Sequence, residues 1–145
     1  MIQAELNQSR LAHGQKLPAK RVVKVLEACA KALKVPGEVT ISLAFVSPRE
    51  MRRLNKHWRG KDAVTDVLSF ELGEGPVKGE LILCYEQAAR QAKEMRHSTS
   101  DELCFLIVHG VLHLWGYDHE NSRDAKKMFP LQERILHSLK IDSRL

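Results

Sequence analysis

Three of the seven histidines in this 145-residue chain fall between positions 109 and 119. On a helix, His109 and His113 would point to the same side, one turn apart. The segment 103–115 around them is almost entirely apolar. A lone histidine there would simply be hydrogen-bonded in the core, but two unpartnered imidazoles would cost several kcal/mol. A divalent metal ion would satisfy both, and His119, beyond Gly116, would complete a three-ligand site with an open coordination position.

The spacing of these histidines and of Gly116 is that of the metzincin peptidases, H-E-x-x-H-x-x-G-x-x-H. One position differs, because Gly110 stands where those peptidases carry the glutamate that acts as general base. The pattern therefore favours a metal site but argues against peptide hydrolysis. A three-histidine site keeps the positive charge of its ion and can bind an anionic phosphodiester. A metal-dependent peptidase or amidase stays an alternative that Gly110 disfavours.

The helix that carries His109 and His113 must itself be buried. Residues 103–115 are apolar on all sides, which is typical of a helix in the centre of a protein. The sequence Thr-Ser-Asp-Glu at 99–102 predicts a capping box at its start, and Gly116 is placed to end it.

Strands and helices alternate along the rest of the chain. Short β-branched or alternating runs predict strands at 2–8, 39–46, 67–72 and 80–85. Helices are expected at 18–34, 47–58, 86–95 and 122–139, with a loop at 59–66. Pro130 should break or kink the last helix near Phe129. The pattern predicts a single α/β domain over 1–145, with one mixed sheet of about four strands packed with helices.

Composition excludes several classes of protein. With 43% apolar and 28% charged residues, the chain is not collagen-like, low in complexity or disordered. It has no apolar run of the roughly 18 residues that a membrane-spanning helix needs, and MIQAELNQSR lacks a signal-peptide core. Cys29, Cys84 and Cys104 are odd in number and lie in apolar contexts. They are expected to be reduced core thiols of a cytoplasmic protein that contacts no membrane.

The positive charge is unevenly distributed. The net charge is +5, and residues 1–58 carry 11 basic but only 4 acidic side chains. Such a basic segment suits a polyanionic partner such as nucleic acid, although a solvated surface explains it equally simply. On the helix predicted at 18–34, one side carries the residues Lys20, Lys24, Lys31 and Lys34. This side is a candidate contact for a phosphate backbone or an ordinary solvated helix face.

Three blocks of the sequence resemble one protein family. HGVLHLWGYDH at 109–119 closely resembles the signature of the YbeY family of bacterial metal-dependent endoribonucleases, which act in ribosomal RNA maturation. LN…RGKD…TDVLSF at 54–70 and GELIL at 79–83 match two further blocks of that family. Glu80 stands for the usual Asp, Glu71 stands where Pro is common, and Pro130 is unusual inside the last helix. None of these differences affects a metal ligand.

The resemblance implies a zincin-like helix and one zinc ion held by His109, His113 and His119. It also implies a single-strand-specific endoribonuclease that matures the 3′ end of 16S ribosomal RNA and acts in ribosome quality control. Its partners would be RNA, the small ribosomal subunit and the assembly factors of that subunit. A non-catalytic ribosome-assembly factor with a structural metal is an alternative, although structural zinc normally has four protein ligands.

The resemblance makes Arg59 the functional arginine. Independently, a guanidinium in a loop can grip a phosphate with two parallel hydrogen bonds, although Arg59 could also be a surface residue beside Asp62. Asp118 is the second catalytic candidate, because it adjoins His119. Its carboxylate can orient an imidazole or cap the turn after Gly116.

Overall fold

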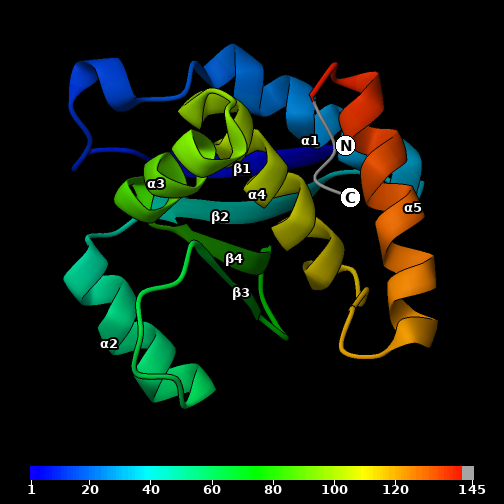
Figure 1. The fold of residues 1–145 in the computed structure, drawn as a ribbon. Helices are drawn as coiled ribbons and strands as arrows, with labels where there is room; N and C mark the ends of the chain where they lie inside the picture. Colours follow the sequence, from blue (N-terminus) through cyan, green and yellow to red (C-terminus); the bar gives the residue numbers. More distant parts are fainter. Residues whose placement is uncertain (142–145) are drawn as a thin grey trace.

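Four short strands form one sheet in a computed structural model that describes residues 1–141. The strands are β1 (Ile2–Asn7), β2 (Val39–Phe45), β3 (Val67–Glu71) and β4 (Val77–Leu83). They lie in the order β1-β2-β4-β3, with β1, β2 and β4 parallel and β3 antiparallel to β4 (Figure 1). The predicted mixed sheet of about four strands is confirmed. The last four residues of the domain expected at 1–145 lie outside the described residues.

Helices cover both faces of the sheet. Within the described chain they are α1 (Ala19–Leu33), α2 (Pro48–Arg59), α3 (Tyr85–Met95), α4 (Thr99–Leu114) and α5 (Ser122–Ser138). Neighbouring strand residues point to opposite faces, so Leu81 and Leu83 of β4 pack under α4, while Ile82 packs with Met51 of α2. Helix α2 therefore lies on the opposite face from α1, α3, α4 and α5 (Figure 1). Strands β3 and β4 are thus packed on both faces where the sheet lies beneath α4.

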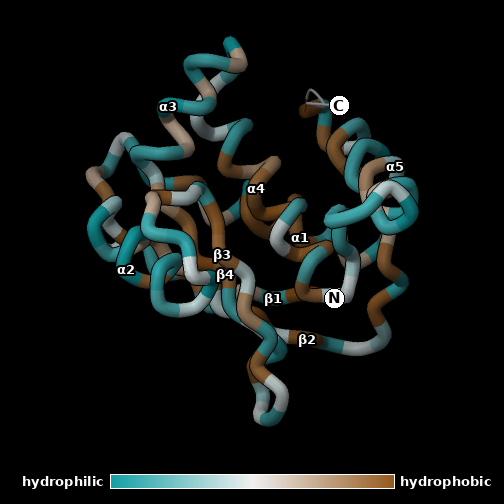
Figure 2. The backbone as a smooth tube through the Cα atoms, turned by 60° about the horizontal axis from the view of Figure 1, so that its bottom comes forward, coloured by the Kyte–Doolittle hydropathy of each residue, from teal (hydrophilic) through white to brown (hydrophobic). Residues whose placement is uncertain are grey.

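Helix α4 is the centre of the core, as its composition predicts. Eleven of its residues are buried, and Figure 2 shows that this largely hydrophobic helix runs through the middle of the molecule. The predicted cap is wrong by one residue, because the hydroxyl of Ser98, not Thr99, accepts the backbone N–H of Asp101. Glu102 cannot complete the capping box because its carboxylate is fully buried and bonds His97 and Gln91 instead.

Gly110 allows α4 to lie directly against the sheet. A Cβ at this position would stand 2.7 Å from Leu81 Cδ2 and 3.2 Å from Ser69 Oγ. Leu81 is fully buried, so its side chain has little room to move away. The hydroxyl of Ser69 also donates to the Gly110 carbonyl at 3.4 Å. A residue larger than glycine at 110 would therefore push α4 away from β3 and β4.

The last helix is not broken at Pro130, although a break was one of the two outcomes expected there. Helix α5 runs without a break from Ser122 to Ser138, with Pro130 inside it. Proline removes the hydrogen bond to the carbonyl four residues earlier, which belongs to Lys126. Both Lys126 and Pro130 are exposed, so water can satisfy that carbonyl. The buried side, which includes Met128, Leu131 and other residues along the helix, keeps the helix packed against the core on both sides of the proline.

Two element boundaries also differ. Arg59, expected at the start of a loop, is the last residue of α2, and Gly60 ends that helix with a φ of 73°. Strand β4 begins at Val77 instead of 80, because its first residues pair with neighbours on both sides despite their polar sequence. Val77 pairs with Thr40 of β2, and Gly79 pairs with Glu71 of β3.

The three cysteines are buried and unbonded, which confirms the prediction of reduced core thiols. Removal from water disfavours the thiolate, so burial raises the pKa of Cys29 to about 12 and that of Cys104 to about 11. Burial also raises the pKa of Cys84.

We expect Gly110→Glu to destabilise the protein severely. Overpacking at such a position costs about 1–3 kcal/mol, and a carboxylate without a partner between α4 and β4 would add to that cost. Urea unfolding should show the loss as a lower midpoint. Gly110→Ala should lose less, because alanine gains about 1 kcal/mol of helix propensity against the same clash. A Gly110→Glu protein with the parent's midpoint would contradict this packing.

Candidate metal centre

Helix α4 and the turn after it bring three imidazoles together. His109 and His113 lie in the last two turns of α4, which ends at Leu114 with Trp115 as its C-cap. Gly116 has a φ of 93°, and the N–H of Tyr117 returns to the carbonyl of Leu112. The chain therefore turns back at this point and carries His119 to the other two rings, whose centroids both lie 5.3 Å from its own.

The three rings offer nitrogen ligands at distances that suit a metal ion. Their ligand atoms all lie within 4.8 Å of one another, and Nε2 of His109 is 3.1 Å from Nε2 of His113. Two nitrogens on one tetrahedral zinc ion are separated by about 3.3 Å, given Zn–N bonds of about 2.05 Å. The pair on α4 is already at that spacing, and a shift of His119, which is exposed, would complete it.

Gln132 fixes the orientation of His109, and sequence reasoning missed it. Its Oε1 lies 2.7 Å from Nδ1 of His109, so Nδ1 carries the proton and Nε2 keeps the lone pair that a metal needs. Gln132 is 1% exposed and lies on the buried side of α5. A glutamine within an otherwise apolar stripe is the signal that could have identified it.

Burial keeps two of the rings neutral. Loss of water lowers the pKa of His109 to about 4, and the nearby His113 and His119 lower it further, whereas the hydrogen bond that His109 donates to Gln132 raises it. Burial, with His119 next, also lowers the pKa of His113. Phe105 stacks on His109, and Phe129 stacks on His119. Neutral imidazoles are in the protonation state that coordinates metals.

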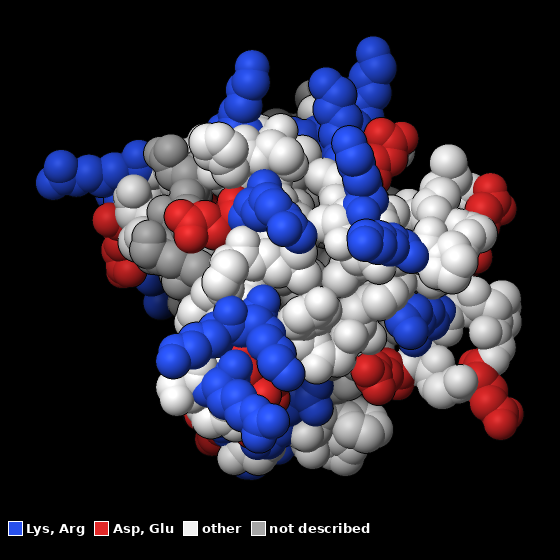
Figure 3. Space-filling view, turned by 90° about the vertical axis from the view of Figure 1, so that its right-hand side faces the viewer, with Lys and Arg blue, Asp and Glu red and all other residues white. Residues whose placement is uncertain are grey.

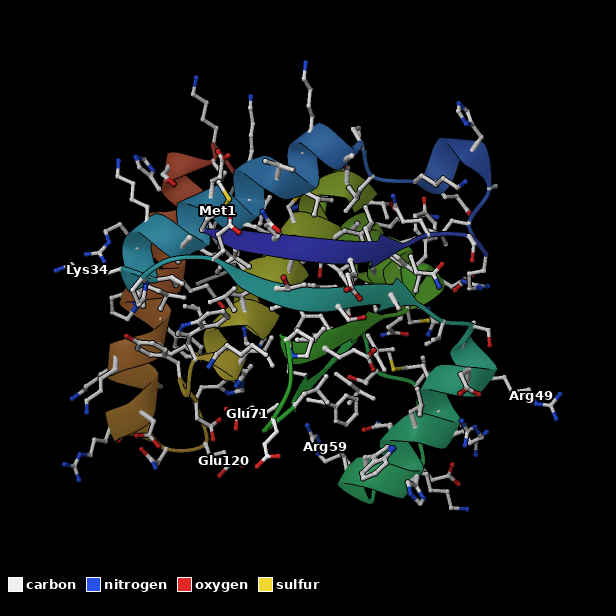
Figure 4. The ribbon with its side chains drawn as sticks, turned by 180° about the vertical axis from the view of Figure 1, so that it is seen from behind. Met1, Lys34, Arg49, Arg59, Glu71 and Glu120 are labelled. Atoms are coloured by element: carbon white, nitrogen blue, oxygen red, sulfur yellow. The ribbon has the colours of Figure 1, made fainter. Side chains whose placement is uncertain are left out.

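The histidines open onto a cleft of about 790 Å³. One wall comes from β3 and the residues just before it, and the other comes from α4, the loop after it and α5. Figure 4 shows Arg59 and Glu71 at one end of the molecule with Glu120. These three side chains come from α2, the end of β3 and the loop after α4, and all of them line the cleft.

Arg59 reaches the cleft in a fixed position. Its Nη2 donates to the carbonyl of Ser69 at 2.6 Å, and its guanidinium lies 5.0 Å from the centre of the Phe70 ring. Asp62, the alternative partner, is bonded by Arg52 at 2.7 and 3.2 Å. Arg59 is therefore not used in an ion pair with Asp62, and its remaining N–H donors can meet a phosphate.

Asp118 lines the cleft but acts on the backbone in this structure. Its Oδ1 accepts the N–H of His119 at 2.7 Å, which holds the turn that carries this histidine. The side chain that orients His109 is Gln132 and not Asp118. Of the two arrangements considered for Asp118, the geometry favours the cap. The negative charge of Asp118 also partly offsets the lowering of the His113 pKa.

A mixed β-sheet lies under a buried helix that carries two histidines, and a third histidine follows the glycine after that helix. This arrangement defines a zincin-like class of proteins that are able to hold a metal. The family model described as Endoribonuclease YbeY matches residues 3–140. This chain belongs to the YbeY family.

Known relatives match most of the chain. The Endoribonuclease YbeY of Ureaplasma parvum serovar 3 is 37% identical over 139 residues, which cover 93% of this chain and 90% of that protein. The Endoribonuclease YbeY of Bacillus pumilus is 43% identical over 129 residues, covering 79% and 81%. The solution structure of TM1509 from Thermotoga maritima matches with a TM-score of 0.61 and 31% identity, over 99% of this chain and 97% of that one.

Within residues 1–141, no helix has the length and apolar character needed to cross a lipid bilayer.

We expect the protein to bind one divalent ion per chain, measured by elemental analysis and by zinc titration. Imidazole must be neutral to coordinate, so affinity should fall as the pH drops below roughly 6. Because the pKa of His109 is about 4, protonation of this ligand should weaken metal binding only when the pH falls to about that value. His113→Ala should lose the ion, and the exposed His137→Ala should retain it. Protein that neither contains metal nor takes up zinc would refute the site.

Proposed function

We propose that this protein is a zinc-dependent endoribonuclease that cleaves single-stranded RNA. The observation that carries the proposal is the cleft in which three imidazoles face the wall bearing Arg59. Membership of the YbeY family and the name shared by its relatives support RNA as the substrate. His109, His113 and His119 would hold the ion. Bound there, zinc supplies a Lewis acid for a phosphoryl oxygen and lowers the pKa of water.

Residues of the chain prepare the cleft for this chemistry. Gln132 holds the proton of His109 on Nδ1, so the lone pair on Nε2 faces the other imidazoles. Arg59 would bind a non-bridging oxygen of the scissile phosphate and stabilise the negative charge that develops there. Its position depends on the Ser69 carbonyl and the Phe70 ring, both on β3. Asp118 would act as a positioning residue through the backbone of His119.

Two alternative functions agree less well with the geometry. A peptidase of this spacing needs a carboxylate at position 110, and Gly110 faces Leu81 and Ser69 with no room for one. A structural zinc site normally has four protein ligands, whereas the metal-ligand group found among the described residues has three and opens to a cleft. Both observations favour catalysis on a substrate other than a peptide.

The cellular role follows from the family resemblance. We propose maturation of the 3′ end of 16S ribosomal RNA and ribosome quality control, with the small ribosomal subunit and its assembly factors as partners. We also propose that the protein acts in the cytoplasm, which its three unbonded cysteines support.

We expect the metal-loaded protein to cleave single-stranded RNA and to leave casein intact. Chelator should abolish the cleavage, and His113→Ala should lose it, because both remove the ion. His137→Ala, which changes an exposed histidine outside the cleft, is the matched control and should keep the parent's activity. The assay is gel electrophoresis of both substrates with and without chelator. Casein cleavage without RNA cleavage would reverse the assignment in favour of the peptidase.

Arg59→Ala should lower the rate of RNA cleavage by roughly tenfold to a thousandfold, because charge on the phosphate would lose its hydrogen-bond donor. Arg59→Lys should recover only part of the rate, since lysine lacks the planar pair of donors. Metal content should be unchanged, and Tm should barely move because Arg59 is exposed. Arg52→Ala on the same helix, outside the cleft, is the control. An Arg59→Ala protein as active as the parent would remove this arginine from the mechanism.

A further inference from the structure

The cleft has too little positive charge to hold an RNA strand by itself. Its charged lining consists of Arg59 and four carboxylates, those of Asp66, Glu71, Asp118 and Glu120. Arg59 and a divalent ion together would supply three positive charges against these four negative ones. Affinity for a phosphate backbone comes chiefly from Lys and Arg side chains that displace counterions. If RNA is the substrate, most of its binding energy must therefore come from another surface.

Helices α1 and α5 carry unpaired positive charge on their outer sides. Every one of the following side chains is exposed: Lys20, Lys24, Lys31 and Lys34 on α1, and Arg123, Lys126, Lys127 and Arg134 on α5. Among the described residues, none of them forms a salt bridge. The exposed carboxylates on these two helices are Glu27 and Glu133. Figure 3 looks onto α5 from outside and shows lysine and arginine side chains gathered on this side.

The two helices enclose a groove of about 560 Å³ between them. Lys24, Lys31 and Arg134 stand at its edge, and its lining includes the apolar side chains of Ala28 and Ile135. Positive charge beside an apolar surface suits single-stranded nucleic acid, whose phosphates and unstacked bases need different surroundings.

Helix α5 joins this groove to the cleft. Phe129 and Gln132 line the cleft, and Arg134 and Ile135 on the same helix line the groove. A helix with its side chains is about 10–12 Å wide, so a strand that leaves the cleft across α5 reaches the groove after that distance. The continuity with the cleft favours an RNA strand over an acidic protein as the occupant.

We infer that the outer sides of α1 and α5, with the groove between them, bind the phosphate backbone of the RNA strand that extends out of the cleft. This inference rests on the proposed function and adds a substrate-binding surface remote from the metal centre. Lys34, at the C-terminal end of α1 beside α5, also lines the groove (Figure 4). Substrates that reach this surface would bind more tightly than short ones that fill only the cleft.

The test measures how salt affects the binding of a single-stranded DNA of about 12 nucleotides, a length within the range of single-strand sites. DNA offers the same phosphates and lacks the 2′-hydroxyl, so binding can be followed on the metal-loaded protein by fluorescence anisotropy. One variant is Lys24→Gln with Lys31→Gln on α1, and another is Lys127→Gln with Arg134→Gln on α5. Each should make the slope of log affinity against log salt shallower by about 1.4, because each loses two contacts worth about 0.7.

The control removes the same charge from another helix. Arg90 and Lys93 are exposed on α3, on the other side of the molecule from α5 (Figure 1). Arg90→Gln with Lys93→Gln should leave the slope and the affinity as in the parent. Because all six positions are exposed, the unfolding midpoints should also match.

Three outcomes would overturn the inference. They are a parent that does not bind the probe, α1 and α5 variants with the parent's slope, and a control that loses as much as they do. If the α1 and α5 variants kept the parent's slope, an acidic protein would be the remaining candidate partner for this surface. The proposed function fails separately: a parent that binds the probe with the expected salt dependence, yet cleaves no RNA in the same buffer, would refute the nuclease and keep the binding surface.

Discussion

The contact between helix α4 and strands β3 and β4 determines where everything in the cleft can lie. Glycines allow it from both sides: Gly110 on the helix faces Leu81, and Gly79 on the strand faces Leu114, where a Cβ would stand 2.6 Å from Cδ2. Because the packing is this close, the histidines on α4 are held at a set distance from β3. The carbonyl of Ser69 on β3 positions Arg59. The packing of α4 against β3 therefore determines how far Arg59 lies from the histidines.

Polar groups on a helix this apolar must all be satisfied locally. At the start of α4, the buried carboxylate of Glu102 accepts from Gln91 and pairs with His97, and Gln91 also donates to Asp66 beside the cleft. At the other end of the helix, Gln132 accepts a hydrogen bond from His109. Among the described residues no buried side-chain nitrogen or oxygen lacks a hydrogen-bond partner. The nitrogens of the histidine group, which face one another and the cleft, are the place where the helix can accept an ion.

The sequence predicts the features that depend on a local pattern of residues. It does not predict the features that depend on contacts between residues far apart in the chain. The apolar helix, the glycine at 116 and the histidine spacing are local, and all three appear in the structure as expected. The break at Pro130 was wrong because the buried side of α5 outweighs one lost hydrogen bond on an exposed side. Gln132 was missed because its partner lies 23 residues away on another helix. The role of Asp118 was left open for a different reason: both candidate partners are near in the sequence, and only the folded turn shows that its carboxylate meets the N–H of His119.

The burial of the cysteines decides which ligands a metal can find. Zinc binds thiolates strongly, and an unfolded form of this chain would offer three of them beside its histidines. Folding places all three sulfurs in the interior and holds them as thiols, with the pKa of Cys29 raised to about 12. Among the residues that the structure describes, the cluster of possible metal ligands that then remains open to solvent is the group of three imidazoles at the cleft. An ion that reached the folded chain would therefore meet these imidazoles and not the thiols.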